Sequence, residues 1–166
     1  LANDASISED GTKLGDPTEV AFIDFSEKLN QPYQEIRNTY PRQAELPFDS
    51  DRKLMSTAHN INNGQYLFVK GGPDIIFGRS KKALVNGEVV PMTEELMTKF
   101  KEQNEAFSNR ALRVLAFAYR PIESTELSFE DENDLILVGL LAMIDPPREE
   151  VTQAVKESRS AGIKTI

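Results

Sequence analysis

A strongly apolar run leads into a lysine and two glycines in the stretch Tyr66-Leu67-Phe68-Val69-Lys70-Gly71-Gly72-Pro73-Asp74. Proline is favourable at the first position of a helix, so this stretch predicts a strand, a tight turn and a helix start. Glycine lets the backbone approach a ligand closely, and a helix start carries partial positive charge. A cation beside such a turn suits a phosphate or a nucleotide. The alternative, which local sequence alone favours, is an ordinary strand-to-helix turn with a solvated lysine.

A hairpin is predicted to precede this turn. The sequence Asn62-Asn63-Gly64 favours a tight turn between an apolar run at 54–58 and the strand at 66–70. With Asn63 and Gly64 as the turn residues, Thr57 would face Lys70. The strand would then lead back to Lys53 and Phe48 at the same end of the sheet.

The remaining elements are expected from capping residues, turn sequences and hydrophobic spacing. They are a helix at about 16–29, a second hairpin across Asn86-Gly87, a helix at about 93–109, strands at 112–119 and 135–144, and a helix at 149–160. Residues 1–14 read as loop, residues 30–47 read mostly as loop or short helix, and the acidic segment 121–134 reads as a solvated connection. The four-residue spacing of Ala21, Phe25 and Leu29 predicts the buried stripe of the first helix. Hairpins mixed with helices predict an α/β (α+β layered) fold with a mainly antiparallel twisted sheet.

Composition limits the possible functions. The chain has 166 residues, 39% of them hydrophobic, which suits one compact domain. Its 19 basic and 27 acidic residues give a net charge of −8, which argues against a nucleic-acid partner. It has no cysteine, so disulfides and thiolate metal sites are excluded. The apolar run at 135–144 is too short to span a bilayer. The chain begins without methionine and is expected to be a piece of a longer protein.

Several runs occur together in one order along nearly the whole chain. They are Gly15-Asp16-Pro17-Thr18-Glu19, Phe48-Asp49-Ser50-Asp51-Arg52-Lys53-Leu54-Met55-Ser56, Lys70 to Asp74, Ala111-Leu112-Arg113-Val114-Leu115-Ala116-Phe117-Ala118-Tyr119-Arg120 and Asp145-Pro146-Pro147-Arg148. This pattern closely resembles the nucleotide-binding (N) domain of P-type cation-transporting ATPases, most nearly the calcium-pump branch. The resemblance implies the fold of that domain, with a sheet flanked by helices.

The resemblance also implies an adenine-nucleotide pocket. Phe48 would stack on the adenine ring, Glu19 beside Thr18 would bind its amino edge, and Lys70 would line the same pocket. Arg113 would reach the phosphates, Lys53 would lie near the nucleotide, and Gly71 and Gly72 would give room. The chain departs from the family pattern in two places. In the lysine motif, Gly72 and Asp74 stand where the family usually has alanine and glutamate, and Ser50 stands where some pumps have a phosphate-binding arginine.

The same resemblance implies the wider context. Residues 1–144 would form the N domain, and 145–166 the hinge (Asp145, Pro146, Pro147, Arg148) and the start of the return into the phosphorylation domain. ATP would be the ligand, with Mg²⁺ held mainly outside this chain. The partners would be the phosphorylation, actuator and transmembrane domains of a cation pump in the cell membrane, with this domain on the cytoplasmic side. The chain lacks the Asp-Lys-Thr-Gly-Thr motif of the phosphorylated aspartate, so it would bind nucleotide without catalytic residues or a metal site of its own.

Each site residue also has a structural alternative. Glu19 could complete a capping box with Asp16, Phe48 could be a core or edge packing residue, and Arg113 could be a solvated strand residue. Lys53 and Arg52 could be surface charges. For the whole chain, the alternatives are a non-catalytic acidic protein-interaction domain and the cap of a soluble phosphatase-like enzyme.

Overall fold

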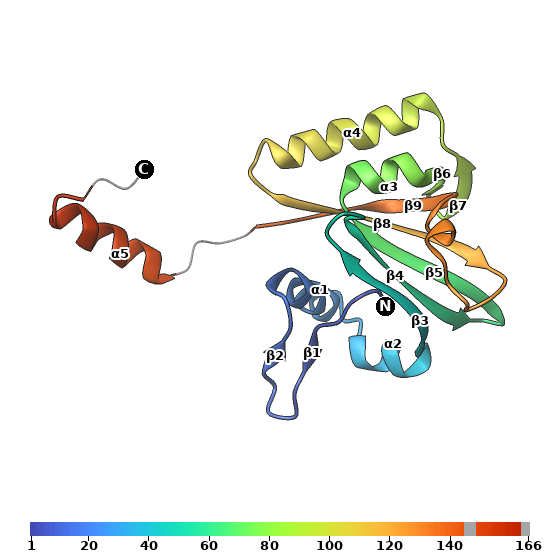
Figure 1. The fold of residues 1–166 in the computed structure, drawn as a ribbon, viewed down its shortest axis with the longest axis horizontal. Helices are drawn as coiled ribbons and strands as arrows, with labels where there is room; N and C mark the ends of the chain where they lie inside the picture. Colours follow the sequence, from blue (N-terminus) through green and yellow to red (C-terminus); the bar gives the residue numbers. More distant parts are fainter. Residues whose placement is uncertain (145–148, 164–166) are drawn as a thin grey trace.

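A computed structural model describes residues 1–144 and 149–163, and its main feature is a seven-stranded sheet with helices on both faces (Figure 1). The strand order is β3-β4-β5-β8-β9-β6-β7. Neighbouring strands are antiparallel except β6 and β9, which are parallel. The prediction of a mainly antiparallel α/β layered fold is therefore confirmed. The strands are β3 (Arg42–Asp49), β4 (Leu54–Ile61), β5 (Gly64–Gly71), β6 (Ser80–Val85), β7 (Glu88–Pro91), β8 (Arg113–Ile122) and β9 (Leu135–Met143).

The helices divide between the two faces of the sheet. One face carries α3 (Pro73–Arg79) and α4 (Glu94–Ser108), and the other carries α1 (Pro17–Lys28) and α2 (Tyr33–Thr39) (Figure 1). A small hairpin of β1 (Ser6–Ile7) and β2 (Lys13–Leu14) precedes α1. The 3₁₀ helix η1 (Phe129–Glu132) precedes β9, and α5 (Glu149–Ser160) follows it along the chain.

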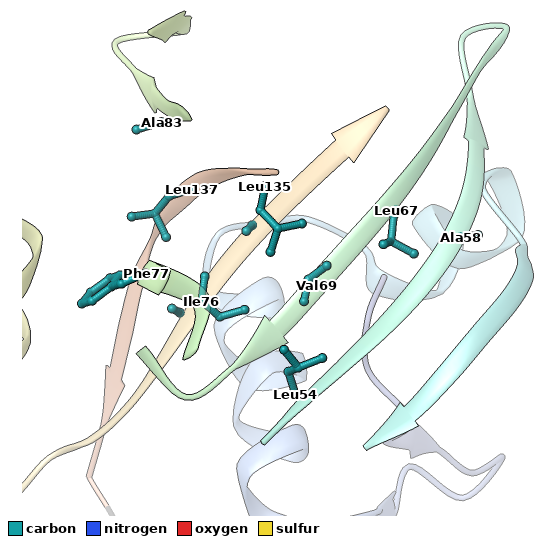
Figure 2. Close-up of a cluster of buried hydrophobic side chains, with 11 residues drawn as sticks. Leu54, Ala58, Leu67, Val69, Ile76, Phe77, Ala83, Leu135 and Leu137 are labelled. Atoms are coloured by element: carbon teal, nitrogen blue, oxygen red, sulfur yellow. The ribbon is translucent and has the colours of Figure 1, made fainter. Parts of the chain in front are cut away.

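The main core lies between the sheet and α3. Leu67 and Val69 from β5 and Leu135 and Leu137 from β9 are at most 1% exposed and point to the same cluster as Ile76 of α3 (Figure 2). Burial of such aliphatic side chains is the dominant favourable contribution to folding. Because side chains alternate along a strand, the residues between these core positions face α1 instead. Lys70 is one of them, since it follows Val69 on β5.

The first hairpin forms with a different turn from the one predicted. Its turn residues are Asn62 and Asn63, both with positive φ (48° and 67°), and Ile61 pairs with Gly64. Two left-handed residues give the turn that matches the twist of a hairpin, and asparagine tolerates that conformation. Lys70 therefore pairs with Met55 rather than Thr57. The change is two residues, so every side chain keeps its predicted face. The second hairpin turns at Asn86-Gly87 as predicted.

Three expectations from local sequence are wrong. Segment 1–14 contains strands β1 and β2, and segment 30–47 contains the start of β3 in addition to the expected short helix, α2. Pairing with neighbours stabilises these strands although their own sequence is loop-like. The predicted buried stripe of Ala21, Phe25 and Leu29 in α1 is also wrong, because the buried residue is Ile23, at 1% exposure, whereas Phe25 and Leu29 are 46% and 55% exposed. The helix has only a weak apolar stripe, so its contacts with the sheet decide which side is buried.

Two expectations concern other parts of the chain. The hinge residues Asp145, Pro146, Pro147 and Arg148 lie outside the described residues. Among the residues that are described, none of the helices combines the length and the apolar character that crossing a bilayer requires.

Candidate functional site

Every residue predicted for the nucleotide site lines one hollow of about 400 Å³. The hollow lies where the end of β5, the start of α1, the β3–β4 turn and the start of β8 meet. Its predicted members are Thr18, Glu19, Phe48, Lys53, Lys70, Gly71, Gly72 and Arg113, and Asp16, Phe22 and Leu115 complete the lining. Segments more than ninety residues apart in sequence are thus brought to one site, as the hydrogen bond between Thr18 and Arg113 shows.

Lys70 is not a solvated lysine, as an ordinary strand-to-helix turn would have it. It is only 6% exposed, and its ammonium forms an ion pair with Oε1 of Glu19. The other carboxylate oxygen of Glu19 accepts the backbone N–H of Asp4 at 2.9 Å. Lys70 Nζ also lies 5.6 Å from the centroid of the Phe22 ring, within the range of a cation–π contact. A largely buried ammonium held in this way presents a fixed positive charge at the floor of the hollow.

Glu19 does not form the capping box that was its alternative role. Asp16 caps α1 by accepting the backbone N–H of Thr18 at 2.8 Å, while the Glu19 side chain turns toward Lys70. Hydrogen bonds from Thr18 hold the pKa of Asp16 below its ordinary value, and the charges of Arg113 and Lys70 add to this effect. The start of α1 therefore brings two carboxylates to the hollow.

Arg113 lies at the rim of the hollow. Arg113 is exposed, which agrees with the alternative that it is a solvated strand residue. Its Nη1 nevertheless donates to Oγ1 of Thr18 at 2.9 Å. This hydrogen bond directs the guanidinium toward the hollow and uses only one of its N–H donors. A guanidinium with free donors is suited to bidentate binding of phosphate.

Phe48 is an exposed side chain rather than a core one. It is 64% exposed and lies in the edge strand β3, beside the hollow. Of the two structural alternatives, packing in the core is therefore wrong, whereas Phe48 does lie on an edge strand. An exposed aromatic ring at the mouth of a hollow is the arrangement that stacking on a planar base requires.

The backbone of Lys53 and Gly71 is packed tightly at this site. Lys53 has a positive φ of 56°, and its carbonyl accepts the backbone N–H of Gly72 at 3.0 Å. A Cβ atom at Gly71 would lie 2.5 Å from that carbonyl oxygen, whereas one at Gly72 would meet nothing closer than 3.9 Å. Gly71 is therefore required for chain packing, and Gly72 is the glycine that leaves open space. The exposed Lys53 side chain lies beside them at the hollow.

Sequence reasoning missed three residues of the lining. Asp16 was considered only as a helix cap, although a cap at a helix start that faces a site also contributes its charge there. Phe22 follows Glu19 by three residues, one helical turn, and Leu115 shares a strand face with Arg113. The helical spacing of Phe22 and the strand alternation of Leu115 could have identified these two apolar residues as part of the lining.

The hollow gathers binding groups of both signs. Three cations, Lys53, Lys70 and Arg113, meet two carboxylates, Asp16 and Glu19, against apolar walls. A neighbouring hollow of about 390 Å³ beneath α1 and α2 has Arg37 as its charged side chain and is otherwise lined mostly by apolar groups. Within residues 1–144 and 149–163 no group of three or more His, Asp or Glu side chains is placed to hold a metal ion.

Comparison with known proteins identifies the family. The model of the P-type ATPase cytoplasmic domain N matches residues 1–150. Calcium-transporting ATPases of Listeria monocytogenes and Lactococcus lactis are each 56% identical over the whole chain. The sodium/potassium-transporting ATPase subunit alpha-4 of Rattus norvegicus is 36% identical over 93% of the chain. The chain spans 19% of the length of the two bacterial relatives and 16% of the rat protein. On this evidence the chain belongs to the cytoplasmic N domain family of the P-type ATPases.

Proposed function

We propose that this chain binds ATP through the hollow between α1, β5 and β8, as the nucleotide-binding domain of an ATP-driven cation pump. The observation that carries the proposal is the exposed ring of Phe48 facing a hollow whose floor holds the buried ammonium of Lys70. Such a combination offers stacking for a base and fixed charge for the polar part of a nucleotide.

Each side chain has a distinct part in the proposed binding. Phe48 stacks on the adenine, which contributes roughly 1–3 kcal/mol. Glu19 accepts a hydrogen bond from the adenine amino group, since each of its carboxylate oxygens keeps a lone pair beyond its present partner. Lys70 fixes that carboxylate. Arg113, held by Thr18, and Lys53 bind the phosphates, and Gly72 leaves room beside them.

ATP would supply the phosphoryl group, but this chain would hold and orient it rather than transfer it. Phosphoryl transfer requires Mg²⁺ and a phosphate acceptor. Mg²⁺ would enter with ATP and be held mainly by residues outside this chain. The acceptor aspartate would lie in the phosphorylation domain of the parent protein.

The wider assignment rests on the relatives. Calcium is the proposed cargo because relatives that match the whole chain are named calcium-transporting ATPases. The proposed partners are the phosphorylation, actuator and transmembrane domains of the same parent chain, which would place this domain on the cytoplasmic side of a membrane. Residues 1–144 form the proposed N domain, and 145–148 the hinge over which it closes.

The binding proposal is tested by titrating the chain with ATP, using calorimetry and NMR. Saturable binding is expected, with amide shifts near Phe48 and Lys70. Phe48→Ala should raise the Kd at least about five-fold through loss of stacking. Phe25→Ala is the matched control, because it removes another solvent-exposed phenylalanine that lies outside the hollow. Absence of shifts at millimolar ATP, or equal Kd values for Phe48→Ala and wild type, contradicts the proposal.

The proposed domain boundary is tested by truncation. A chain that stops at residue 144 keeps every strand of the sheet, because β9 ends at Met143. It should fold cooperatively and bind ATP with a Kd within about two-fold of the longer chain. Loss of cooperative unfolding would place the boundary elsewhere.

A further inference from the structure

Glu132 is a fully buried carboxylate in a segment whose composition predicts a solvated loop. Its exposure is 0%, whereas its neighbour Glu130 is exposed. Ser56 Oγ donates to Oε1 of Glu132. Arg52 Nε lies 2.9 Å from Oε2 and Arg79 Nη1 lies 3.5 Å from the same oxygen. A carboxylate is buried in this way only where cations and hydrogen bonds replace water.

Arg52 extends this cluster to the proposed nucleotide site. Its Nη2 donates to the carbonyl of Pro47 at 2.7 Å and lies 3.4 Å from the carbonyl of Leu54. Pro47 precedes Phe48 and Leu54 follows Lys53. A single guanidinium, held by Glu132, therefore contacts the backbone on both sides of the β3–β4 turn. Its side chain is only 12% exposed, so the surface-charge alternative for Arg52 is wrong.

Regular strand pairing does not hold Phe48 in place. Leu46 pairs with Ser56 and Asp49 pairs with Leu54, so Pro47 and Phe48 together oppose the single residue Met55. This is a β-bulge, which re-aims a side chain and leaves backbone groups without ladder partners. The Pro47 carbonyl at the bulge receives its hydrogen bond from Arg52 instead. Because the Phe48 ring is mostly exposed, packing does not fix it either.

We propose that Glu132 is a positioning residue for the nucleotide site. Glu132 holds Arg52, and the bond from Arg52 to the Pro47 carbonyl sets the direction of Phe48. The contact of Arg52 with the Leu54 carbonyl supports the left-handed backbone of Lys53. Glu132 itself lies on the α3 side of the sheet with Ser56, so it acts on the nucleotide without touching it. This inference rests on the proposed function of the hollow.

The first test compares three variants of the full chain with wild type. Glu132→Gln keeps the shape of the side chain but removes the charge that holds Arg52. We expect a Kd for ATP about 3- to 30-fold higher than wild type, the range typical of coupling through a contact network. Arg79→Gln should change the Kd less than about two-fold, because Arg79 touches the carboxylate but not the turn. Leu137→Ala destabilises the core by deleting a fully buried side chain and should leave the Kd of the folded protein unchanged.

A second readout does not depend on nucleotide. In the ligand-free protein, Glu132→Gln should shift the backbone amide signals of Phe48 and Lys53, and Leu137→Ala should not. Arg52→Gln should have the same effect as Glu132→Gln, and the double variant should be no worse than the more affected single variant. Additive effects would mean that the two residues act separately and would overturn the proposal.

The outcomes separate this inference from the binding proposal. If wild type fails to bind ATP, the proposed function fails, and the ligand-free amide shifts still test the positioning role. If wild type binds and folded Glu132→Gln shows both an unchanged Kd and unchanged Phe48 signals, the positioning role is overturned. Should Glu132→Gln not fold, Arg52→Lys replaces it, because lysine keeps the charge but lacks the fork that reaches the Pro47 carbonyl. The same shift and the same rise in Kd are then expected, and unchanged values overturn the proposal.

Discussion

Lys70→Met tests the ion pair that forms the floor of the hollow. The variant leaves the Glu19 carboxylate, whose side chain is 17% exposed, without its cation. Removing one partner of a fully buried ion pair costs about 3–5 kcal/mol. Glu19 keeps some access to water and the Asp4 amide, so we expect a loss of about 2 kcal/mol in the free energy of unfolding. For a chain of 166 residues this corresponds to a fall in Tm of about 4–8 °C.

The double variant of Lys70→Met with Glu19→Gln separates the pair from general loss of packing. With both charges removed, stability should return to within about 1 kcal/mol of wild type, because no unpaired charge remains. ATP affinity should stay low, since the amide lacks the charge and the methionine lacks the cation. Lys99→Met is the matched control: it breaks an exposed ion pair on α4 and should change Tm by less than about 2 °C.

Thermal unfolding followed by circular dichroism measures the stability terms, and calorimetric titration measures the Kd. A Tm for Lys70→Met within about 1 °C of wild type would refute the account of a buried, energetically coupled pair. So would a double variant whose destabilisation equals the sum of the two single losses. Recovery of stability together with full recovery of ATP affinity would refute the binding role and leave only the structural one.

Gly71→Ala should destabilise the chain strongly, because its Cβ would press on the backbone of the neighbouring turn, whereas Gly72→Ala should be tolerated; chemical unfolding of the two variants measures the difference. Burial lowers the pKa of His59 below its ordinary value of 6.5, so the unfolded chain binds protons more tightly than the folded one. Stability should therefore be constant above about pH 6.5 and fall as the pH drops below it. His59→Gln should reduce that slope in urea unfolding measured from pH 7 to pH 5, and an unchanged slope would show that other groups cause it.

Local sequence predicted the helices and strands more accurately than it predicted which residues pair across them. The strand, turn and helix around Lys70 follow from an apolar run, two glycines and a proline, and the structure has each of them. The hairpin register differs by two residues because two asparagines in a row offer a second left-handed pair, and nothing nearby in sequence chooses between the turns. The faces were still predicted correctly, since a shift of two preserves alternation.

Long-range pairing explains what local sequence did not predict. Glu19 has the spacing of a capping-box residue, and its contact with Lys70 depends on a strand fifty-one positions away. Glu132 lies in a run of acidic residues that is typical of a solvated loop, yet Ser56, Arg52 and Arg79 surround its carboxylate. The resemblance to a family predicted that the residues of the hollow share one site, because a family pattern carries information about tertiary contacts that periodicity lacks. It did not indicate Glu132, which lies outside every run on which the resemblance was based.

If Phe48 stacks on a base as proposed, the groups that orient its ring must lie away from the ligand. A ring that stacks on a base must be exposed before the base arrives, so the burial that orders a core phenylalanine is not available to it. Its direction must then come from the backbone, and at Phe48 the backbone leaves the regular ladder in a bulge. The bond that replaces the ladder comes from Arg52, and Arg52 is itself fixed by a carboxylate with no access to solvent. The exposed ring of Phe48 and the buried carboxylate of Glu132 thus lie on opposite sides of the sheet, and the guanidinium of Arg52 connects them.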